Sequence, residues 1–222
     1  LTHWDDKSYV TDNEHIKGLK WENIKLFLTE YYAGNYQPVT ILMYAIEYKF
    51  AGADGTLYHL NNLLLHLLNT VLVFLFIRKI SPQNAYAALI TATFFAVHPM
   101  HVESVAWVSE RKDVLYTFFF LIALINYSDY LKTQKSKHLI LSTIFYVLSC
   151  LSKPAAVILP LVLLLMDYYA GRKLSTKILL EKTHFFLLAL IFGVVAIKAQ
   201  GEALHDTAAV PFIQHFSMVT YS

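Results

Sequence analysis

The sequence predicts an all-α membrane protein, a polytopic helical bundle with an outer-face loop that carries amphipathic helices. Three observations support this fold class. Of the 222 residues, 56% are hydrophobic. The apolar residues form several long stretches that follow one another along the chain, a pattern that soluble domains do not show. Basic residues occupy every second connector between these stretches, whereas nearly all acids occupy the others.

Residues 1 to 57 are predicted to form a loop outside the membrane with two amphipathic helices. The segment is mixed in character and rich in Asp, Asn, Tyr and Trp. Apolar side chains recur there at steps of three and four, as Trp21, Ile24, Leu28 and Tyr31 and then, after Pro38, as Val39, Leu42, Met43, Ile46 and Phe50. Charged residues interrupt both stretches, so they suit a membrane surface or the cap of a bundle.

Residues 58 to 199 are predicted to form a bundle of about six transmembrane helices. The apolar segments run over residues 57–77, 85–97, 114–130, 139–151, 155–169 and 185–197. Several are shorter than the ~20 residues that a full span needs, so flanking residues must complete them. Residues 200 to 222 are predicted to form another outer-face loop. The single cysteine, Cys150, excludes an internal disulfide.

The basic connectors predict how the bundle is oriented. Their cations are Arg78, Lys79, Lys132, Lys135, Lys137, Arg172, Lys173, Lys177 and Lys182. By the positive-inside rule these connectors are cytoplasmic. The first loop, the connector from His98 to Asp113, the turn at Lys153 and the tail are then on the periplasmic or lumenal face. Asp129, Asp167 and Glu181 are exceptions to the charge pattern, and each lies at or beyond a helix end.

Two groups of charged residues on this face are candidates for catalysis. Asp5 and Asp6 are adjacent, and neighbouring carboxylates raise one another's pKa, which suits a general base or a metal ligand. A solvated acidic loop is the alternative. In the connector, a helix from Val102 onward would place Glu103, Ala106, Glu110 and Asp113 on one face.

Cations on the same face are candidates for phosphate binding. Arg111, Lys112 and Lys153 stand among outer-face acids. A phosphate at the membrane surface would explain them, and so would ordinary lipid headgroups.

Histidines and asparagines form two further patterns. His98, His101 and Glu103 could bind zinc, but Pro99 interrupts the helix that ligands at this spacing would need. His59, Asn62, His66 and Asn69 form a polar stripe along one transmembrane helix. Hydrogen bonds between helices explain the deeper pair, whereas His59 and Asn62 lie near the outer end and could border a site.

Five strings lie in order along residues 3 to 173: "WDDKSYVTDN", "GNYQPVTILMYAIEY", "GTLYHLNNLLLHLLNTVLVF", "FAVHPMHVESVAWVSERKDVL" and "LSKPAAVILPLVLLLMDYYAGR". Together they resemble the membrane part of the transmembrane and tetratricopeptide-repeat O-mannosyltransferases, most closely the bacterial relatives. The resemblance implies a GT-C glycosyltransferase fold. It also implies a span before Leu1 and further spans with tetratricopeptide repeats after Ser222.

In this family the acidic pair after the first span is the catalytic motif, and it corresponds to Asp5 and Asp6. The H-P-x-H-x-E motif corresponds to His98, Pro99, His101 and Glu103. The resemblance implies transfer of mannose or another hexose from a polyprenyl-phosphate carrier to a hydroxyl on a protein or glycan.

Such transfer needs a base for the hydroxyl and a cation for the leaving phosphate. A divalent metal is a possible cofactor and membrane lipid an expected partner, whereas no nucleic acid is expected. A non-enzymatic membrane scaffold and a transporter are the alternative functions. No Asp or Glu lies in the middle of an apolar segment, which disfavours a transporter.

Overall fold

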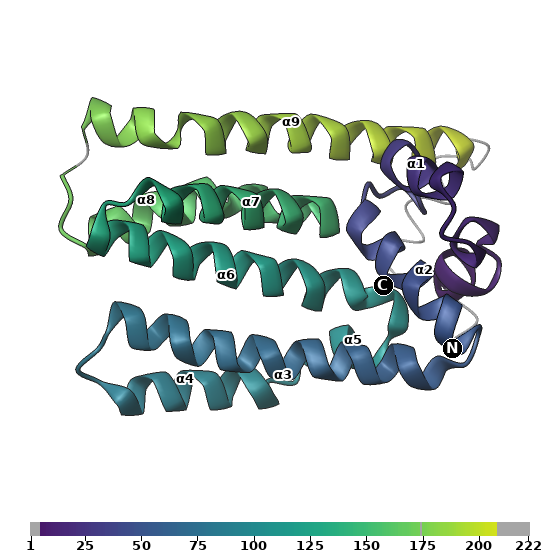
Figure 1. Ribbon diagram of the computed structural model, residues 1–222, viewed down its shortest axis with the longest axis horizontal. Coiled ribbons are helices and arrows are strands. Elements are labelled where there is room, and N and C mark those ends of the chain that lie inside the picture. The colour runs from purple at the N-terminus through teal and green to yellow at the C-terminus, as the bar shows by residue number, and fades with distance from the viewer. Residues whose placement is uncertain (1–4, 174, 208–222) are drawn as a thin grey trace, which may run out of the picture.

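The computed structural model describes residues 5–173 and 175–207, and side chains as far as residue 201. Figure 1 shows a bundle of long helices with shorter helices at one end. The helices of the bundle are α3 (Gly55–Ile80), α4 (Ala85–Val97), α6 (Arg111–Thr133), α7 (Ser136–Ser152), α8 (Leu159–Tyr169) and α9 (Thr176–Thr207). The remaining helices are α1 (Trp21–Thr29), α2 (Pro38–Ala51), α5 (His101–Ala106), η1 (Lys7–Thr11), η2 (Glu14–Lys17), η3 (Val108–Glu110) and η4 (Pro154–Ile158).

The protein is an integral membrane protein of the all-α class, as the sequence predicts. Within the described residues, three helices are long and apolar enough to cross a membrane, at Gly55–Ile80, Val108–Thr133 and Thr176–Gly201. Three shorter apolar helices, Ala85–Val97, Ser136–Ser152 and Pro154–Tyr169, lie beside them. These six helices correspond to the six apolar segments of the sequence. One isolated bridge between Tyr32 and Asn35 is the sole β feature in this part of the chain.

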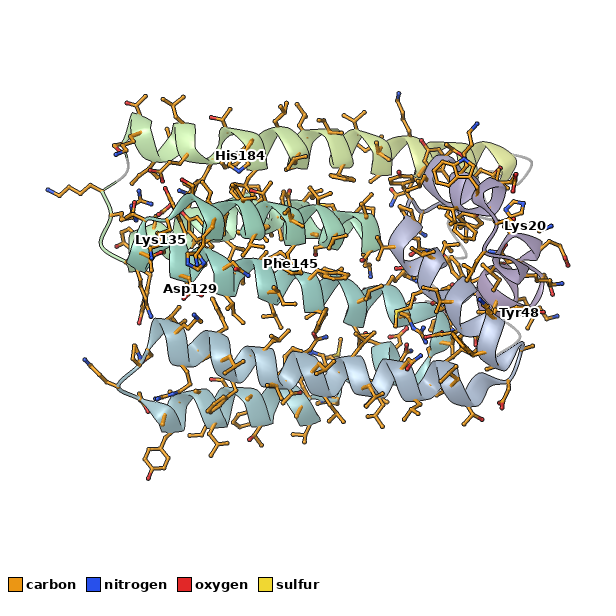
Figure 2. All side chains as sticks on the ribbon, in the orientation of Figure 1. Lys20, Tyr48, Asp129, Lys135, Phe145 and His184 are labelled. Atoms are coloured by element: carbon orange, nitrogen blue, oxygen red, sulfur yellow. The ribbon has the colours of Figure 1, made fainter. Side chains whose placement is uncertain are left out.

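The two ends of the bundle differ in what they carry. At the end that holds α1 and α2 in Figure 1 lie residues 5–54, the 98–110 connector and the turn at 152–154, here called the loop end. The opposite end holds the connections at 81–84 and 134–135 and residues 170–173, here called the basic end. Figure 2 shows Lys20 and Tyr48 at the loop end and Asp129 and Lys135 at the basic end.

Local sequence signals account for several helix boundaries. The Asp54 carboxylate caps α3 by accepting a hydrogen bond from the Thr56 backbone N–H at 3.0 Å. That hydrogen bond lowers the pKa of Asp54. Asn84 caps α4 in the same way through the Ala87 N–H at 2.9 Å. Gly52 ends α2 at a φ of +57°, a conformation that glycine adopts without strain.

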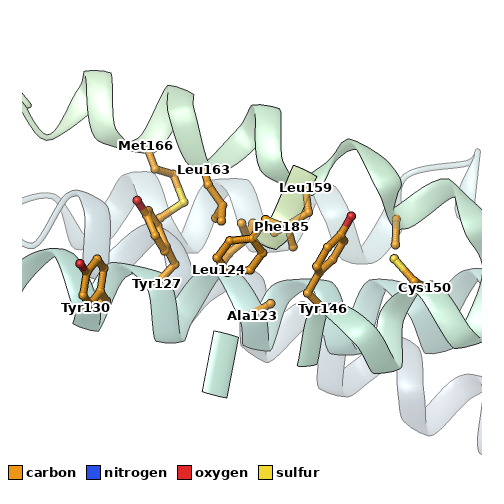
Figure 3. Packing of buried hydrophobic residues seen from close by; sticks show 11 residues of the cluster. Ala123, Leu124, Tyr127, Tyr130, Tyr146, Cys150, Leu159, Leu163, Met166 and Phe185 are labelled. Atoms are coloured by element: carbon orange, nitrogen blue, oxygen red, sulfur yellow. The ribbon is translucent and has the colours of Figure 1, made fainter. Parts of the chain in front are cut away.

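The two largest hydrophobic cores among the described residues lie at different places in the fold. The bundle core joins α6, α7, α8 and α9 around Tyr127, Tyr146, Leu159 and Phe185, as Figure 3 shows. The loop end has a core of its own, which includes Tyr9, Val10, Ile16, Phe27, Ile41, Tyr44, Tyr58 and Val108. The loop end is therefore a packed layer on the bundle.

The apolar stripes predicted for α1 and α2 pack only partly against the rest of the protein. Trp21 and Phe50, which the spacing placed on the apolar faces, are 71% and 78% exposed. Phe27, Ile41 and Tyr44, which lie outside the predicted stripes, are fully buried. Predicted α1 also extended to Tyr31, whereas the helix ends at Thr29. Exposed aromatic residues at this end of the bundle suit the membrane interface.

Two other expectations need correction. The chain is extended at Trp107, so α5 and α6 are separate helices and Glu103, Ala106, Glu110 and Asp113 share no helix face. The tail predicted as a loop from residue 200 begins as helix, because α9 continues to Thr207. Residues 208–222 lie outside the described part of the chain.

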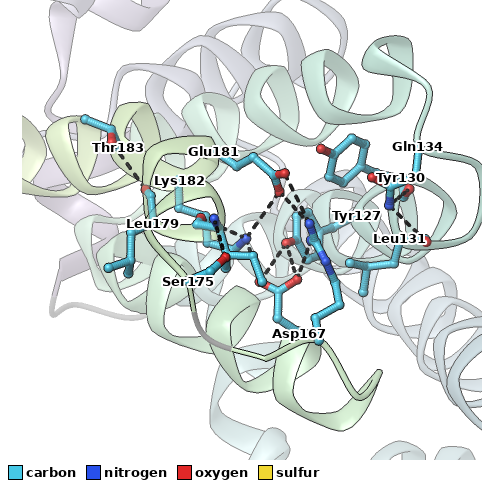
Figure 4. A network of polar contacts seen from close by, with 12 residues as sticks. Tyr127, Tyr130, Leu131, Gln134, Asp167, Ser175, Leu179, Glu181, Lys182 and Thr183 are labelled. Atoms are coloured by element: carbon cyan, nitrogen blue, oxygen red, sulfur yellow. Dashed lines mark hydrogen bonds and ion pairs between the residues drawn. The ribbon is translucent and has the colours of Figure 1, made fainter.

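Ion pairs explain the acids that interrupt the basic connectors. Lys79 pairs with Asp129. Figure 4 shows Asp167, Glu181 and Lys182 in one polar network. Arg172 joins this network through both Asp167 and Glu181. These acids offset cations that are buried or partly buried where the helices meet.

Candidate active site

The acidic pair packs directly against the connector. Asp5 and Asp6 lie just before η1. The Asp6 side chain is fully buried, and its carboxylate accepts a hydrogen bond from the Ser109 backbone N–H at 2.9 Å. Asp5 is half-buried. Two segments that are 103 residues apart in the sequence thus meet at the loop end.

A second acid and a lysine lie beside this contact. The Lys112 ammonium is 2.7 Å from the Glu110 carboxylate and 5.6 Å from the centre of the Tyr9 ring. Burial raises the pKa of Tyr9, and the charges of Asp5 and Glu110 raise it further. Both carboxylates therefore raise the pKa of the same buried phenol, and the Lys112 ammonium lies over its ring.

Arg111 forms the centre of a buried clamp that holds the connector in place. Its guanidinium donates through Nε to Asn62 Oδ1 and through Nη2 to the Tyr58 carbonyl, each at 2.7 Å, and pairs through Nη1 with the Glu47 carboxylate. The rings of Tyr44 and Tyr58 lie 5.0 and 5.8 Å from its central carbon. Arg111 and its contacts in α2 and α3 are here called the Arg111 clamp.

Backbone carbonyls of the connector are bound by the same elements. The Tyr44 hydroxyl donates to the Val108 carbonyl at 2.7 Å, and Asn62 Nδ2 donates to the Trp107 carbonyl at 3.0 Å. Burial raises the pKa of Glu47, and the neighbouring Arg111 opposes that shift. The segment whose Ser109 N–H donates to Asp6 is therefore held from α2, α3 and α6 together.

The position of Arg111 does not favour the predicted contact with a donor phosphate. Its side chain has no exposed surface, and all three of its nitrogens are bonded to protein groups. A ligand could reach the guanidinium only if the clamp opened. Phosphate binding by Arg111 stays a prediction, whereas its structural role is visible.

Lys153 lies in a more accessible place. It lines a cavity of about 220 Å³ between α3, α5, α6 and the turn after α7. Its ammonium pairs with Asp113, and the two side chains are 28% and 26% exposed. Asn69 also lines the cavity, and its buried Oδ1 has no hydrogen-bond partner in the described part of the chain. The cavity is therefore polar and has an unused acceptor.

The histidines divide between this cavity and the surface. His66 and His101 line the cavity. His101 Nδ1 is 2.9 Å from the Phe95 carbonyl, and His66 Nε2 is 3.0 Å from the Ala96 carbonyl. Because a carbonyl only accepts, these ring nitrogens are the donors. His98 and His59 are exposed.

The predicted site residues thus fall into three groups. Asp6 and Lys112 lie at the acidic pair, Asn62 lies in the Arg111 clamp, and His101 and Lys153 lie at the cavity. Glu103 is exposed on α5. Within the described residues, no three His, Cys, Asp or Glu side chains are grouped so that they could hold a metal ion.

Sequence reasoning missed Glu47 and Tyr44 as members of these groups. The polar stripe on α3 was the one available signal, since Asn62, His66 and Asn69 all bond to carbonyls of neighbouring segments. The deeper pair makes the predicted hydrogen bonds between helices, and it lines the cavity as well.

Comparisons with known proteins agree with the sequence strings. The family model described as dolichyl-phosphate-mannose-protein mannosyltransferase matches residues 36–199. The chain is 31% identical over 147 residues to Protein O-mannosyl-transferase Tmtc1 of Drosophila melanogaster, covering 65% of this chain and 17% of the relative. It is 34% identical over 94 residues to Protein O-mannosyl-transferase TMTC1 of Homo sapiens, covering 42% and 11%.

A further relative is Protein O-mannosyl-transferase tmtc2 of Xenopus laevis, which is 28% identical over 139 residues that cover 59% of this chain and 16% of the relative. The chain thus spans less than a fifth of the length of these three relatives. No solved structure matches the chain.

Proposed function

The chain belongs to the dolichyl-phosphate-mannose-protein mannosyltransferase family, and on that premise we propose that it is the membrane part of a glycosyltransferase. The enzyme moves mannose or another hexose from a polyprenyl-phosphate carrier to a hydroxyl acceptor, with Ser or Thr of a protein as the favoured acceptor. The reaction takes place at the loop end, on the periplasmic or lumenal side of the membrane.

The contact between Asp6 and Ser109 is the observation that carries this proposal. It brings the acidic pair onto the connector, which the Arg111 clamp holds against α2 and α3. A catalytic group must be held in a fixed position by its surroundings if it is to act efficiently. The loop end supplies such a position, because the backbone of the connector is bonded on several sides.

Asp5 is the favoured general base. A hydroxyl is a poor nucleophile, and a carboxylate that takes its proton assists the attack on the anomeric carbon. As the new C–O bond forms, the bond from the anomeric carbon to the phosphate oxygen breaks. The polyprenyl phosphate leaves with the electron pair, and a single displacement inverts the anomeric centre. The buried Asp6 carboxylate positions the segment that carries Asp5.

Lys153 is the favoured cation for the leaving phosphate. The phosphate ester gains negative charge as it leaves, and a fixed cation stabilises that charge. Lys153 is partly exposed in the cavity, whereas Arg111 is fully enclosed and Lys112 pairs with Glu110. The open lipid-facing sides of the bundle provide apolar surface for the polyprenyl tail.

A transfer assay tests the proposal. Full-length protein in vesicles is given a synthetic polyprenyl-phosphate mannose and a Ser- and Thr-containing peptide, and the product is analysed by mass and by anomeric configuration. We expect mannosyl peptide with the configuration opposite to that of the donor. Retention of configuration would exclude the direct displacement. A protein that binds the donor without transferring sugar would be a scaffold, and uptake of sugar into the vesicles would indicate a transporter.

A further inference from the structure

A large apolar groove lies at the basic end, far along the bundle from the acidic pair. Its volume is about 650 Å³, within the range of small-molecule sites in proteins. The groove runs between α3, α6 and α8, and apolar side chains form most of its lining. They include Phe76, Leu131, Val162, Leu165 and Met166.

The groove carries positive charge at one end. Lys79 and Lys132 are the two charged residues in its lining, and no carboxylate is among the lining residues. Asp129 neutralises Lys79. The Lys132 ammonium donates to the Lys79 carbonyl at 2.8 Å, and no carboxylate lies within ion-pair distance of it in the described part of the chain. The Lys132 ammonium is therefore a cation without an acidic partner at one end of an apolar groove.

We propose that this groove binds an anionic phospholipid. The lipid phosphate contacts the Lys132 ammonium, and one acyl chain lies along Leu131, Val162 and Leu165. Basic pockets between transmembrane helices on the cytoplasmic side are suited to anionic headgroups. The positive-inside rule places the basic end on that side.

The position of the charge favours a phospholipid over a protein segment. Lys132 lies at the last turn of α6, at the level where headgroups meet the hydrocarbon. The apolar side chains of the groove continue from that level toward the middle of the bundle, as Leu165 and Val162 follow Tyr169 back along α8. A charged head above an apolar chain matches this order, and Leu165 is 66% exposed, so the groove is open to lipid.

The experiment measures lipid selectivity directly. Full-length protein is reconstituted in phosphatidylcholine vesicles with a small fraction of spin-labelled lipid, and motionally restricted phosphatidylglycerol is compared with motionally restricted phosphatidylcholine. We expect a preference for phosphatidylglycerol of about fivefold at one site, as for a single basic residue near the membrane surface. Lys132→Gln should abolish the preference, and Leu165→Trp should remove the bound lipid by filling the groove.

Two matched variants serve as controls. Lys137→Gln removes an exposed cation at the same end that does not line the groove, and Leu161→Trp enlarges an exposed side chain one turn away on α8. Both should keep the preference. Equal preference in Lys132→Gln and wild type would overturn the proposal. So would a photo-crosslinker at position 165 that attaches to a second protein chain, or to another segment of the same chain, in place of lipid.

Discussion

The two ends of the bundle both bury ion pairs, but they differ in the number of ion-pair partners that each buried charge has. At the loop end, the most deeply buried pair joins one cation to one acid, Arg111 to Glu47, and it is almost completely enclosed. At the basic end, two cations meet two acids. Arg172 lies 2.7 Å from Asp167 and 3.0 Å from Glu181, and Lys182 lies 2.5 and 3.9 Å from the same acids.

This difference predicts how each end responds to substitution. Removing one member of an isolated buried pair leaves a lone charge in a low dielectric, which is costly. In the basic-end network each acid keeps a second cation when one is lost. The Tyr127 hydroxyl donates to Asp167 as well, at 3.0 Å. The loop end is therefore the sensitive end, and it is also where the candidate active site lies.

The largest effect is expected for the acidic pair. Asp5→Asn should lower sugar transfer by about 10²–10⁴-fold, as typical for loss of a general base, while membrane insertion persists. Initial rates with a polyprenyl-phosphate sugar, normalised to folded protein, provide the measurement. Asp12→Asn changes an exposed acid of the same loop, and Glu181→Gln changes an acid of the basic end; both should transfer sugar normally. Full activity of Asp5→Asn would remove the acidic pair from the mechanism.

Breaking the Arg111 clamp should have the largest effect on stability. Arg111→Ala leaves Glu47 buried without its cation, and we expect a loss of about 3–5 kcal/mol in the free energy of unfolding in detergent. The double variant Glu47→Leu with Arg111→Met should recover part of that loss, because it removes both charges and keeps the volume. If Arg111→Ala unfolds at the wild-type denaturant concentration, the clamp is not the structural centre of the loop end.

Lys153 tests whether the cavity takes part in transfer. Lys153→Gln should lower the turnover about 10²-fold, as removal of one group that stabilises a developing negative charge does. Its stability should change little, because the pair with Asp113 is partly exposed to solvent. The expected result for Lys153→Gln is a lower transfer rate with the same unfolding midpoint as the wild type. Equal losses in rate and in folded fraction would assign Lys153 a structural role alone.

The smallest effect is expected at the basic end. Arg172→Ala should lower the free energy of unfolding by about 1 kcal/mol or less, since its side chain is 21% exposed and Lys182 remains with both acids. Thermal unfolding of this variant beside Arg111→Ala gives the comparison directly. If Arg172→Ala lowers the free energy of unfolding more than Arg111→Ala does, the basic end and not the loop end is the more sensitive to substitution.

Much of the fold follows from the sequence alone. The six apolar segments and the alternation of basic connectors depend on the length of a stretch and on the residues next to it. Such signals are local, because a hydrocarbon core demands apolar length wherever the chain crosses it. Asp5 and Asp6 were likewise candidates for catalysis from the sequence, because two carboxylates are adjacent there.

Tertiary structure decided the roles of the charged side chains. The sequence position of Arg111 is the same whether its side chain meets a phosphate or a buried acid. Its partner Glu47 lies 64 residues away on α2, outside the apolar stripe that the residue spacing indicates. Lys153 and Asp113 came together only when α7 packed against α6. Burial and pairing depend on which distant segments meet, and a hydrophobic pattern along one helix does not contain that information.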